Sequence, residues 1–288
     1  MENILIKVKT KIKIYLAFST RVVRFSKDIV LIFFFIINNL IKYKKIYDND
    51  IVFVSAIEKN YFSQIKSLLV SYEKYLNNKF ILYDLGMEEK QIEFLKNNHK
   101  QVEIRNFQFA NYPKFIGTYF DDKLGNYAWK PVIIDEVLNE VSSKVVWLDA
   151  GNIIDKKINF LKISLTAKGI IVPISSNRIK DWTHKITQDY IGISKKNLNK
   201  SNYASGLIGF DFNKPKAYQI STEWKEYSLI QECISPPGSS RKNHRQDQAV
   251  LTLLLYKHLF KNRFIQLTYP STNFILGVLF HKKRIFDF

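Results

Sequence analysis

From residue 50 onward, short apolar runs of strand length alternate with segments whose apolar residues recur at helical spacing. Strands are expected at residues 51–55, 80–83 and 102–104, and helices at residues 61–76 and 88–96. Strands separated by helices of this length usually pair in parallel through right-handed crossovers. The pattern therefore predicts an α/β domain with a mixed, mostly parallel central sheet flanked by helices.

The stretch of residues 125–152 (GNYAWKPVIIDEVLNEVSSKVVWLDAGN) gives the strongest site signal. A polar, aromatic loop leads into a helix opened by Pro131, and a short apolar strand then ends at Asp149. Loops at strand ends converge on a crevice, so Asp149 is either a site residue or an ordinary strand-ending acid. Lys130 places a cation at the helix start, which indicates either a bound anion or a solvated lysine.

The second half of the chain continues the alternation. Further strands are expected at residues 169–173 and 206–212, and further helices at residues 216–226 and 249–259. The loop at residues 235–243 (SPPGSSRKN) combines Pro, Gly and Ser with basic residues, so it is expected to be a mobile connection. It either closes over an anionic substrate or is a plain surface loop.

The charge of the chain limits the classes of partner. The formal net charge is +18, which favours phosphorylated small molecules, acidic lipid surfaces or nucleic acid, although a Lys- and Asn-rich composition bias gives the same number. A nucleic-acid-binding protein is disfavoured, because the lysines are dispersed and no recognised nucleic-acid motif occurs. The single cysteine, Cys233, excludes an internal disulfide and a Cys-clustered zinc site.

Residues 1–48 form a basic and apolar helical appendage to the domain expected at residues 49–288. The apolar run at residues 29–41 is shorter than the roughly 20 residues that span a bilayer. Its basic flanks favour a helix lying on an anionic membrane surface, with a true span and a buried helix as alternatives. No small-residue cleavage site follows, so a removable signal peptide is not expected. The chain is therefore expected at the cytoplasmic face of a membrane, peripheral or monotopic.

Four motifs, in this order, resemble the nucleotide-diphospho-sugar glycosyltransferases of GT-A fold. They are Trp129-Lys130-Pro131, Val146-Trp147-Leu148-Asp149-Ala150-Gly151-Asn152, Ala204-Ser205-Gly206-Leu207-Ile208-Gly209-Phe210 and Arg245-Gln246-Asp247-Gln248. The resemblance spans most of residues 50–285. It implies a Rossmann-like GT-A domain of the kind that builds bacterial polysaccharides and other glycans. The implied enzyme is a hexosyl- or related transferase that moves a sugar from a nucleotide-diphosphate sugar to a glycan or lipid-linked acceptor.

The resemblance also implies a metal site, but this sequence lacks one of the acids expected there. Asp149 matches the first acid of an Asp-x-Asp element that holds Mg²⁺ or Mn²⁺ on the donor diphosphate. Gly151 stands where the second acid is expected, so metal dependence stays open. Asp149, Asn152 and His281 are the candidate metal ligands, with a purely structural histidine as the alternative for His281. A degenerate protein that binds a nucleotide sugar or glycan without turnover is the alternative function.

The remaining roles follow from the same resemblance. Asp149 and Asp247 are the candidate catalytic residues. Asp247 is preferred to Asp211 as the base of an inverting transfer, although it can also cap its helix. The candidate donor-binding residues are Ser55, Ala56, Asp84, Trp129, Lys130, Gly151, Asn152, His281 and Lys283. The candidate acceptor-side residues are Ser205, Gly206 and Gln248.

Overall fold

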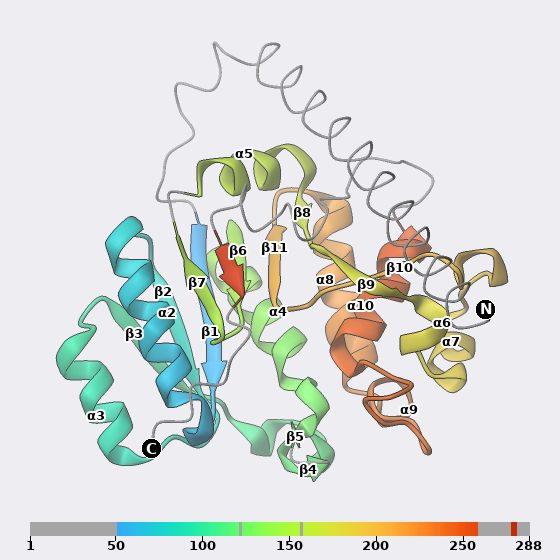
Figure 1. Ribbon diagram of the computed structural model, residues 1–288, viewed down its shortest axis with the longest axis horizontal. Coiled ribbons are helices and arrows are strands. Elements are labelled where there is room, and N and C mark those ends of the chain that lie inside the picture. Colours follow the sequence, from blue (N-terminus) through green and yellow to red (C-terminus); the bar gives the residue numbers. More distant parts are fainter. Residues whose placement is uncertain (1–50, 121–122, 156–157, 259–277, 281–288) are drawn as a thin grey trace, which may run out of the picture.

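The computed structural model describes residues 51–120, 123–155, 158–258 and 278–280 (Figure 1). The expected appendage at residues 1–48 lies outside the described residues, and so do His281 and Lys283. No helix in the described ranges has the length and apolar character needed to cross a membrane.

A six-stranded mixed sheet forms the centre of the domain, in the order β3-β2-β1-β6-β11-β8. Strands β1 to β3 and β6 run parallel, while β11 is antiparallel to both of its neighbours, β6 and β8. The six strands are β1 (Ile51–Ile57), β2 (Phe80–Asp84), β3 (Val102–Asn106), β6 (Lys144–Leu148), β8 (Ile170–Ile171) and β11 (Leu207–Asp211). The mixed, mostly parallel sheet expected from the sequence is confirmed.

Helices connect and cover these strands. The α-helices are α2 (Phe62–Tyr75), α3 (Glu89–Asn98), α4 (Trp129–Val141), α5 (Asn159–Lys168), α6 (Ile179–Trp182), α7 (Lys185–Ile191), α8 (Pro215–Ser228), α9 (Gln231–Ile234) and α10 (Gln246–His258). Short 3₁₀ turns are η3 (Lys59–Tyr61), η4 (Phe109–Asn111), η5 (Lys114–Gly117), η6 (Gly125–Tyr127) and η7 (Lys195–Asn197). Three small sheets pair β4 (Tyr119–Phe120) with β5 (Lys123–Leu124), β9 (Ile174–Arg178) with β10 (Ser201–Tyr203), and β7 (Asn152–Ile154) with β12 (Val278–Phe280).

Alternating side chains of the sheet build two apolar cores, because successive residues of a strand point to opposite faces. Val54 and Trp147 belong to the core that includes α4, α8 and α10, whereas Phe53 and Val146 belong to the core with α2, α3 and α5. Figure 1 shows the sheet in the middle of the molecule, with α2 and α3 on the left and α8 and α10 on the right. Burial on both faces explains why the strands read as continuous apolar runs.

Two strands differ from the sequence expectation in ways that affect the site. Strand β1 continues to Ile57, so Ser55 lies inside the strand and not at its end as expected. Strand β11 runs against β6, with Leu207 opposite Leu148 and Asp211 opposite Lys144. The start of β11 therefore lies at the same sheet edge as the end of β6, and Asp211 lies at the opposite edge.

Candidate functional site

A cavity of about 390 Å³ opens at the carboxyl edge of the parallel strands. Strand β1 contributes Ala56 and Ile57, and the ends of β6 and α4 contribute Asp149 and Lys130. The turn before β11 contributes Ser205 and Gly206, and the loop and first turn of α10 contribute Arg241, Arg245, Asp247 and Gln248. The volume falls in the range usual for small-molecule sites, roughly 300–1,000 Å³.

Lys130 joins the two candidate catalytic acids at the floor of this cavity. Its Nζ lies 2.9 Å from Oδ1 of Asp149 and 3.3 Å from Oδ2 of Asp247, and it also lies 3.3 Å from the carbonyl oxygen of Ser205. Oδ1 of Asp149 also accepts a hydrogen bond of 2.7 Å from Nε1 of Trp147. Lys130 is 3% exposed, so the alternative of a solvated lysine is wrong, and the anions beside it belong to the chain itself.

Burial and charge shift the pKa values of Lys130 and Asp247. Burial alone lowers the pKa of Lys130, but the carboxylates of Asp149 and Asp247 outweigh burial and raise it above its ordinary value. Burial raises the pKa of Asp247, and Lys130 opposes that rise only in part. Asp247 is 3% exposed, whereas the side chain of Asp149 is 45% exposed. Asp149 therefore presents a free carboxylate edge to the cavity, and Asp247 is a buried acid that binds a proton more readily than usual.

Three consecutive left-handed residues position the start of α4. Gly125, Asn126 and Tyr127 have φ values of 53°, 47° and 64°. A Cβ at Gly125 would lie 2.2 Å from the carbonyl oxygen of Ile116, so only glycine fits there. This turn directs the chain so that Trp129 and Lys130 enter the cavity wall.

The loop before α10 is held by a buried histidine, His244. Its Nδ1 accepts a hydrogen bond from the backbone N–H of His184 at 3.2 Å, and its Nε2 donates to the carbonyl oxygen of Ile234 at 3.1 Å. The neighbouring Arg245 donates its backbone N–H to the carbonyl oxygen of Trp182 at 3.0 Å. Burial lowers the pKa of His244 to about 4, so the imidazole is neutral at physiological pH.

Most of the site residues expected from the sequence meet in this cavity. Those lining it are Ala56, Trp129, Lys130, Asp149, Gly151, Ser205, Gly206, Asp247 and Gln248. Ser55 is fully buried inside β1 and does not line the cavity. Asp84 also lies outside the lining, and its carboxylate accepts hydrogen bonds from the backbone N–H groups of Gly86 and Met87.

The structure adds several residues that the sequence reasoning did not select. Trp147 lies on β6, two positions before Asp149. In an extended chain this spacing puts both side chains on one face, so the sequence alone could have indicated that Trp147 lies beside Asp149. Tyr127 belongs to the left-handed turn, and its hydroxyl accepts a 3.3 Å hydrogen bond from Nη1 of Arg241. The sequence analysis included Arg241 in a basic loop and Arg245 in a motif, without giving either a role. Both line the cavity, and no pattern in the sequence predicts this.

Two of the candidate metal ligands, Asp149 and Asn152, lie in the described residues, and they do not by themselves form a closed site for a divalent cation. Oδ1 of Asp149 is already bound by Lys130 and Trp147. Asn152 is fully buried, and its Nδ2 donates to the carbonyl oxygen of Gly206 at 2.6 Å. Within the part of the chain that is described, no three His, Cys, Asp or Glu side chains are grouped so that they could hold a metal. Among the described candidate ligands, the exposed edge of Asp149 is therefore the accessible carboxylate, which is fewer oxygen ligands than a site built by protein groups alone uses.

Comparison with known proteins gives limited sequence likeness. Residues 16–135 match a family described as "Protein of unknown function (DUF1647)". This match includes Lys130 and ends before Asp149 and Asp247. No curated protein sequence matches the chain.

Solved structures give a clearer likeness. An active-site mutant of LgtC superposes with a TM-score of 0.50 at 12% identity, over 81% of this chain and 88% of that one. The fold is GT-A. Core-mannan synthase A from Aspergillus fumigatus, in its Mn/GDP form, gives 0.49 at 8% identity over 72% of this chain and 70% of that one. The bifunctional glycosyltransferase WbbM gives 0.46 at 12% identity over 74% of this chain, which spans 38% of the length of WbbM.

Replacing Lys130 tests the buried charge arrangement of this GT-A domain. Lys130→Met leaves the buried Asp247 facing Asp149 without a cation, so we expect the free energy of unfolding at neutral pH to fall by about 3–5 kcal/mol. Urea denaturation measures the change. Adding Asp247→Asn should recover part of the loss, and Lys242→Met, at an exposed position, should stay within about 0.5 kcal/mol. A Lys130→Met effect as small as that of Lys242→Met would contradict the arrangement.

The buried His244 predicts acid sensitivity. Below about pH 6.5 the unfolded chain takes up a proton on this imidazole, whereas the folded chain does not until about pH 4. Stability should therefore fall as pH decreases across this window, by up to about 3 kcal/mol. His244→Gln keeps an acceptor and a donor but does not titrate, so its unfolding free energy should vary less with pH. Equal pH slopes for both proteins would refute the prediction.

Proposed function

We propose that this protein transfers a sugar from a nucleotide-diphosphate sugar to a glycan or lipid-linked acceptor. The observation that carries the proposal is the cavity at the carboxyl edge of a GT-A sheet, with two carboxylates around Lys130 on its floor. Ligands of open α/β sheets bind at this edge. The end of β1, at Ala56, would contact the nucleoside, and the turn at Ser205 and Gly206 together with Gln248 would face the acceptor.

Asp247 is suited to take the proton of the acceptor hydroxyl in an inverting transfer. The acceptor oxygen then bonds to the anomeric carbon as the bond to the diphosphate oxygen breaks, and that electron pair leaves with the nucleoside diphosphate. Burial raises the pKa of Asp247, which makes it a better proton acceptor than an ordinary carboxylate. Before the step, two carboxylates face one ammonium; afterwards Lys130 and Asp149 remain as a neutral pair. Proton uptake therefore removes the excess negative charge of the triad.

Asp247→Asn tests this role. We expect kcat to fall by about 100-fold or more, because the amide does not accept the proton, while binding of the donor nucleotide stays within a few-fold. The matched control is Asp211→Asn, a buried acid at the opposite edge of the sheet. Transfer is followed as release of nucleoside diphosphate in the presence of an acceptor glycan. Equal losses in both variants would contradict a catalytic role for Asp247.

The donor class is identified first by thermal shift with UDP-, GDP- and CMP-sugars, because ligands that bind the folded state raise its melting temperature. Stabilisation by a nucleotide sugar, followed by release of its nucleotide, supports the transferase. Stabilisation without turnover with any acceptor would support the degenerate binding protein. Two observations support the degenerate binding protein. Position 151 is not an acid, and the described residues contain no group of three or more side chains that could hold a metal.

We also propose that residues 1–48 bring the enzyme to the cytoplasmic face of an anionic membrane. The support is the sequence alone, in which a short apolar run is flanked by lysines and arginines. In a vesicle flotation assay, the full chain should float with vesicles containing phosphatidylserine, and a chain lacking residues 1–47 should stay at the bottom. Thermal shift with the donor nucleotide would verify that the shortened chain is folded. Flotation of the shortened chain would overturn this proposal.

A further inference from the structure

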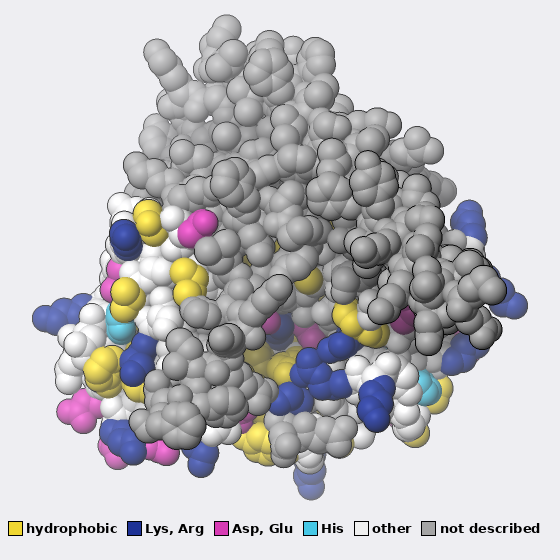
Figure 2. Space-filling view, viewed as in Figure 1, with side chains coloured by type: hydrophobic (Ala, Val, Ile, Leu, Met, Phe, Trp, Pro, Cys, Tyr) yellow, Lys and Arg dark blue, Asp and Glu magenta, His cyan; other side chains and the backbone are white. Residues whose placement is uncertain are grey.

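Two arginines on the rim of the cavity have no counter-charge in the described part of the chain. Arg241 and Arg245 both line the cavity, and no carboxylate there forms an ion pair with either. Burial and the nearby charge of Arg241 lower the pKa of Arg245, a sign that the two cations lie close together. Figure 2 shows Lys and Arg side chains gathered near the centre of the lower half of this face. Such an arrangement favours an anionic ligand with two charges.

Each guanidinium group contacts an aromatic residue of the chain. The guanidinium of Arg245 stacks on Trp182 with 4.1 Å between its central carbon and the ring centroid. Its buried Nε has no hydrogen-bond partner among the described residues. Arg241 donates a hydrogen bond to the hydroxyl of Tyr127. The loop that carries both arginines is closed by backbone hydrogen bonds from Asn243 and His244 to the carbonyl oxygen of Ser240, and by the side chain of His244. A preorganised guanidinium pair costs little further ordering when a phosphate arrives.

A cation of the chain itself partly offsets the charge of the two acids in the same cavity. The ammonium of Lys130 lies between the carboxylates of Asp149 and Asp247. This internal cation reduces the repulsion that an incoming diphosphate would meet at the floor of the cavity. Lys130 therefore offsets part of the negative charge of the two acids, and the arginines form no ion pair with them among the described residues.

We propose that Arg241 and Arg245 neutralise the diphosphate of the donor, so that donor binding and transfer need no divalent metal. This inference rests on the proposed function. The N–H groups of the two guanidiniums donate to the phosphate oxygens, including the one that gains an electron pair when the bond to the sugar breaks. Two positive charges then match the two negative charges of a nucleotide-diphosphate sugar.

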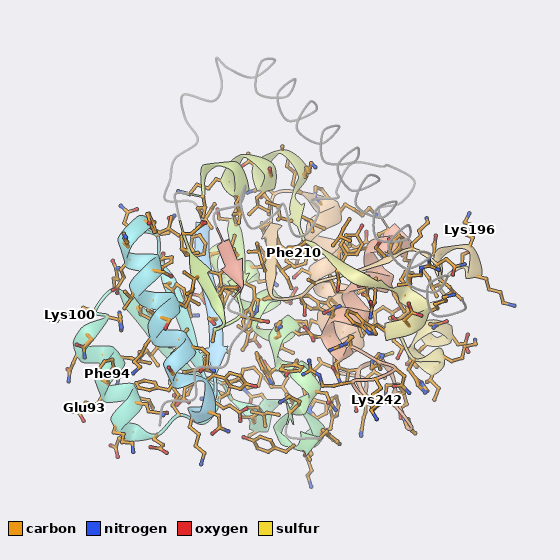
Figure 3. All side chains as sticks on the ribbon, viewed as in Figure 1. Glu93, Phe94, Lys100, Lys196, Phe210 and Lys242 are labelled. Atoms are coloured by element: carbon orange, nitrogen blue, oxygen red, sulfur yellow. The ribbon has the colours of Figure 1, made fainter. Side chains whose placement is uncertain are left out.

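The test measures the affinity of the full chain for UDP and GDP by calorimetry, in EDTA and in Mn²⁺. For whichever nucleotide binds, we expect affinities within about threefold in the two buffers. Arg241→Ala and Arg245→Ala should each weaken binding in EDTA by about 10- to 100-fold. The control is Lys242→Ala, because Lys242 does not line the cavity and Figure 3 places it at the outer edge of the loop. Its affinity should stay within about twofold of wild type.

The other results of this experiment separate a failure of the arginine proposal from a failure of the proposed function. Binding only in Mn²⁺, or binding in EDTA that survives both arginine replacements, overturns the metal-free role of the arginines and leaves the proposed function standing. No binding of UDP or GDP in either buffer, together with no thermal shift by any of the nucleotide sugars, overturns the proposed function and this inference together. A melting curve for each variant verifies that it is folded, and Arg241 is exposed, so its replacement should not unfold the domain.

A further variant tests the same inference by adding a carboxylate to the cavity. A Cβ at Gly151 meets no atom within 4 Å, so Gly151→Asp fits without repacking and completes an Asp-x-Asp sequence. The added charge should weaken nucleotide binding in EDTA by about tenfold, and Mn²⁺ should restore it. Unchanged binding in EDTA would contradict a diphosphate bound in this cavity, whose lining includes Gly151.

Discussion

The buried ammonium of Lys130 is the contact on which the candidate site depends. It joins Asp149, which directly follows β6 in the middle of the sheet, to Asp247, in the first turn of α10 about a hundred residues later. Burying one cation between two anions is costly unless each has close partners, and here Trp147, Ser205 and the two carboxylates supply them. The elements around the cavity are therefore held in register by charge as well as by apolar packing.

The antiparallel direction of β11 brings Ser205 and Gly206 to this site. In an all-parallel sheet, the residues before β11 would lie at the far edge, away from Asp149. Reversal brings Gly206 beside the end of β6, where its carbonyl oxygen accepts the backbone N–H of Asp149 at 2.9 Å and the side chain of Asn152 at 2.6 Å. Asn152 thus fixes the turn after Asp149. Its Oδ1, the atom that would bind a metal, is buried and has no hydrogen-bond partner among the described residues.

The sequence predicted the layers of the fold well, because apolar runs and helical spacing report burial directly. It also selected both ends of the central ion pair, Lys130 and Asp149, from their places at a helix start and a strand end. It could not show that Lys130 is buried, since that follows from contacts with Asp247, far along the chain. The extension of β1 past Ser55 and the turn-capping role of Asp84 were missed for a similar reason, as both depend on neighbouring strands and turns. The arginines of the basic loop could be noted but not placed, because loop direction has no periodic pattern.

The contacts of the left-handed turn at Gly125–Tyr127 show how much of the chain is needed to form the site. Asn126 donates to the hydroxyl of Ser235 at 2.7 Å, and Tyr127 contacts Arg241, so the turn ties the cavity wall to residues more than a hundred positions away. The cavity lining itself extends from Ala56 to Gln248. No short fragment of the protein contains the site, and contacts of such high sequence separation form slowly during folding. Strands and helices can persist in a truncated chain, but the pocket exists only when nearly the whole domain is present.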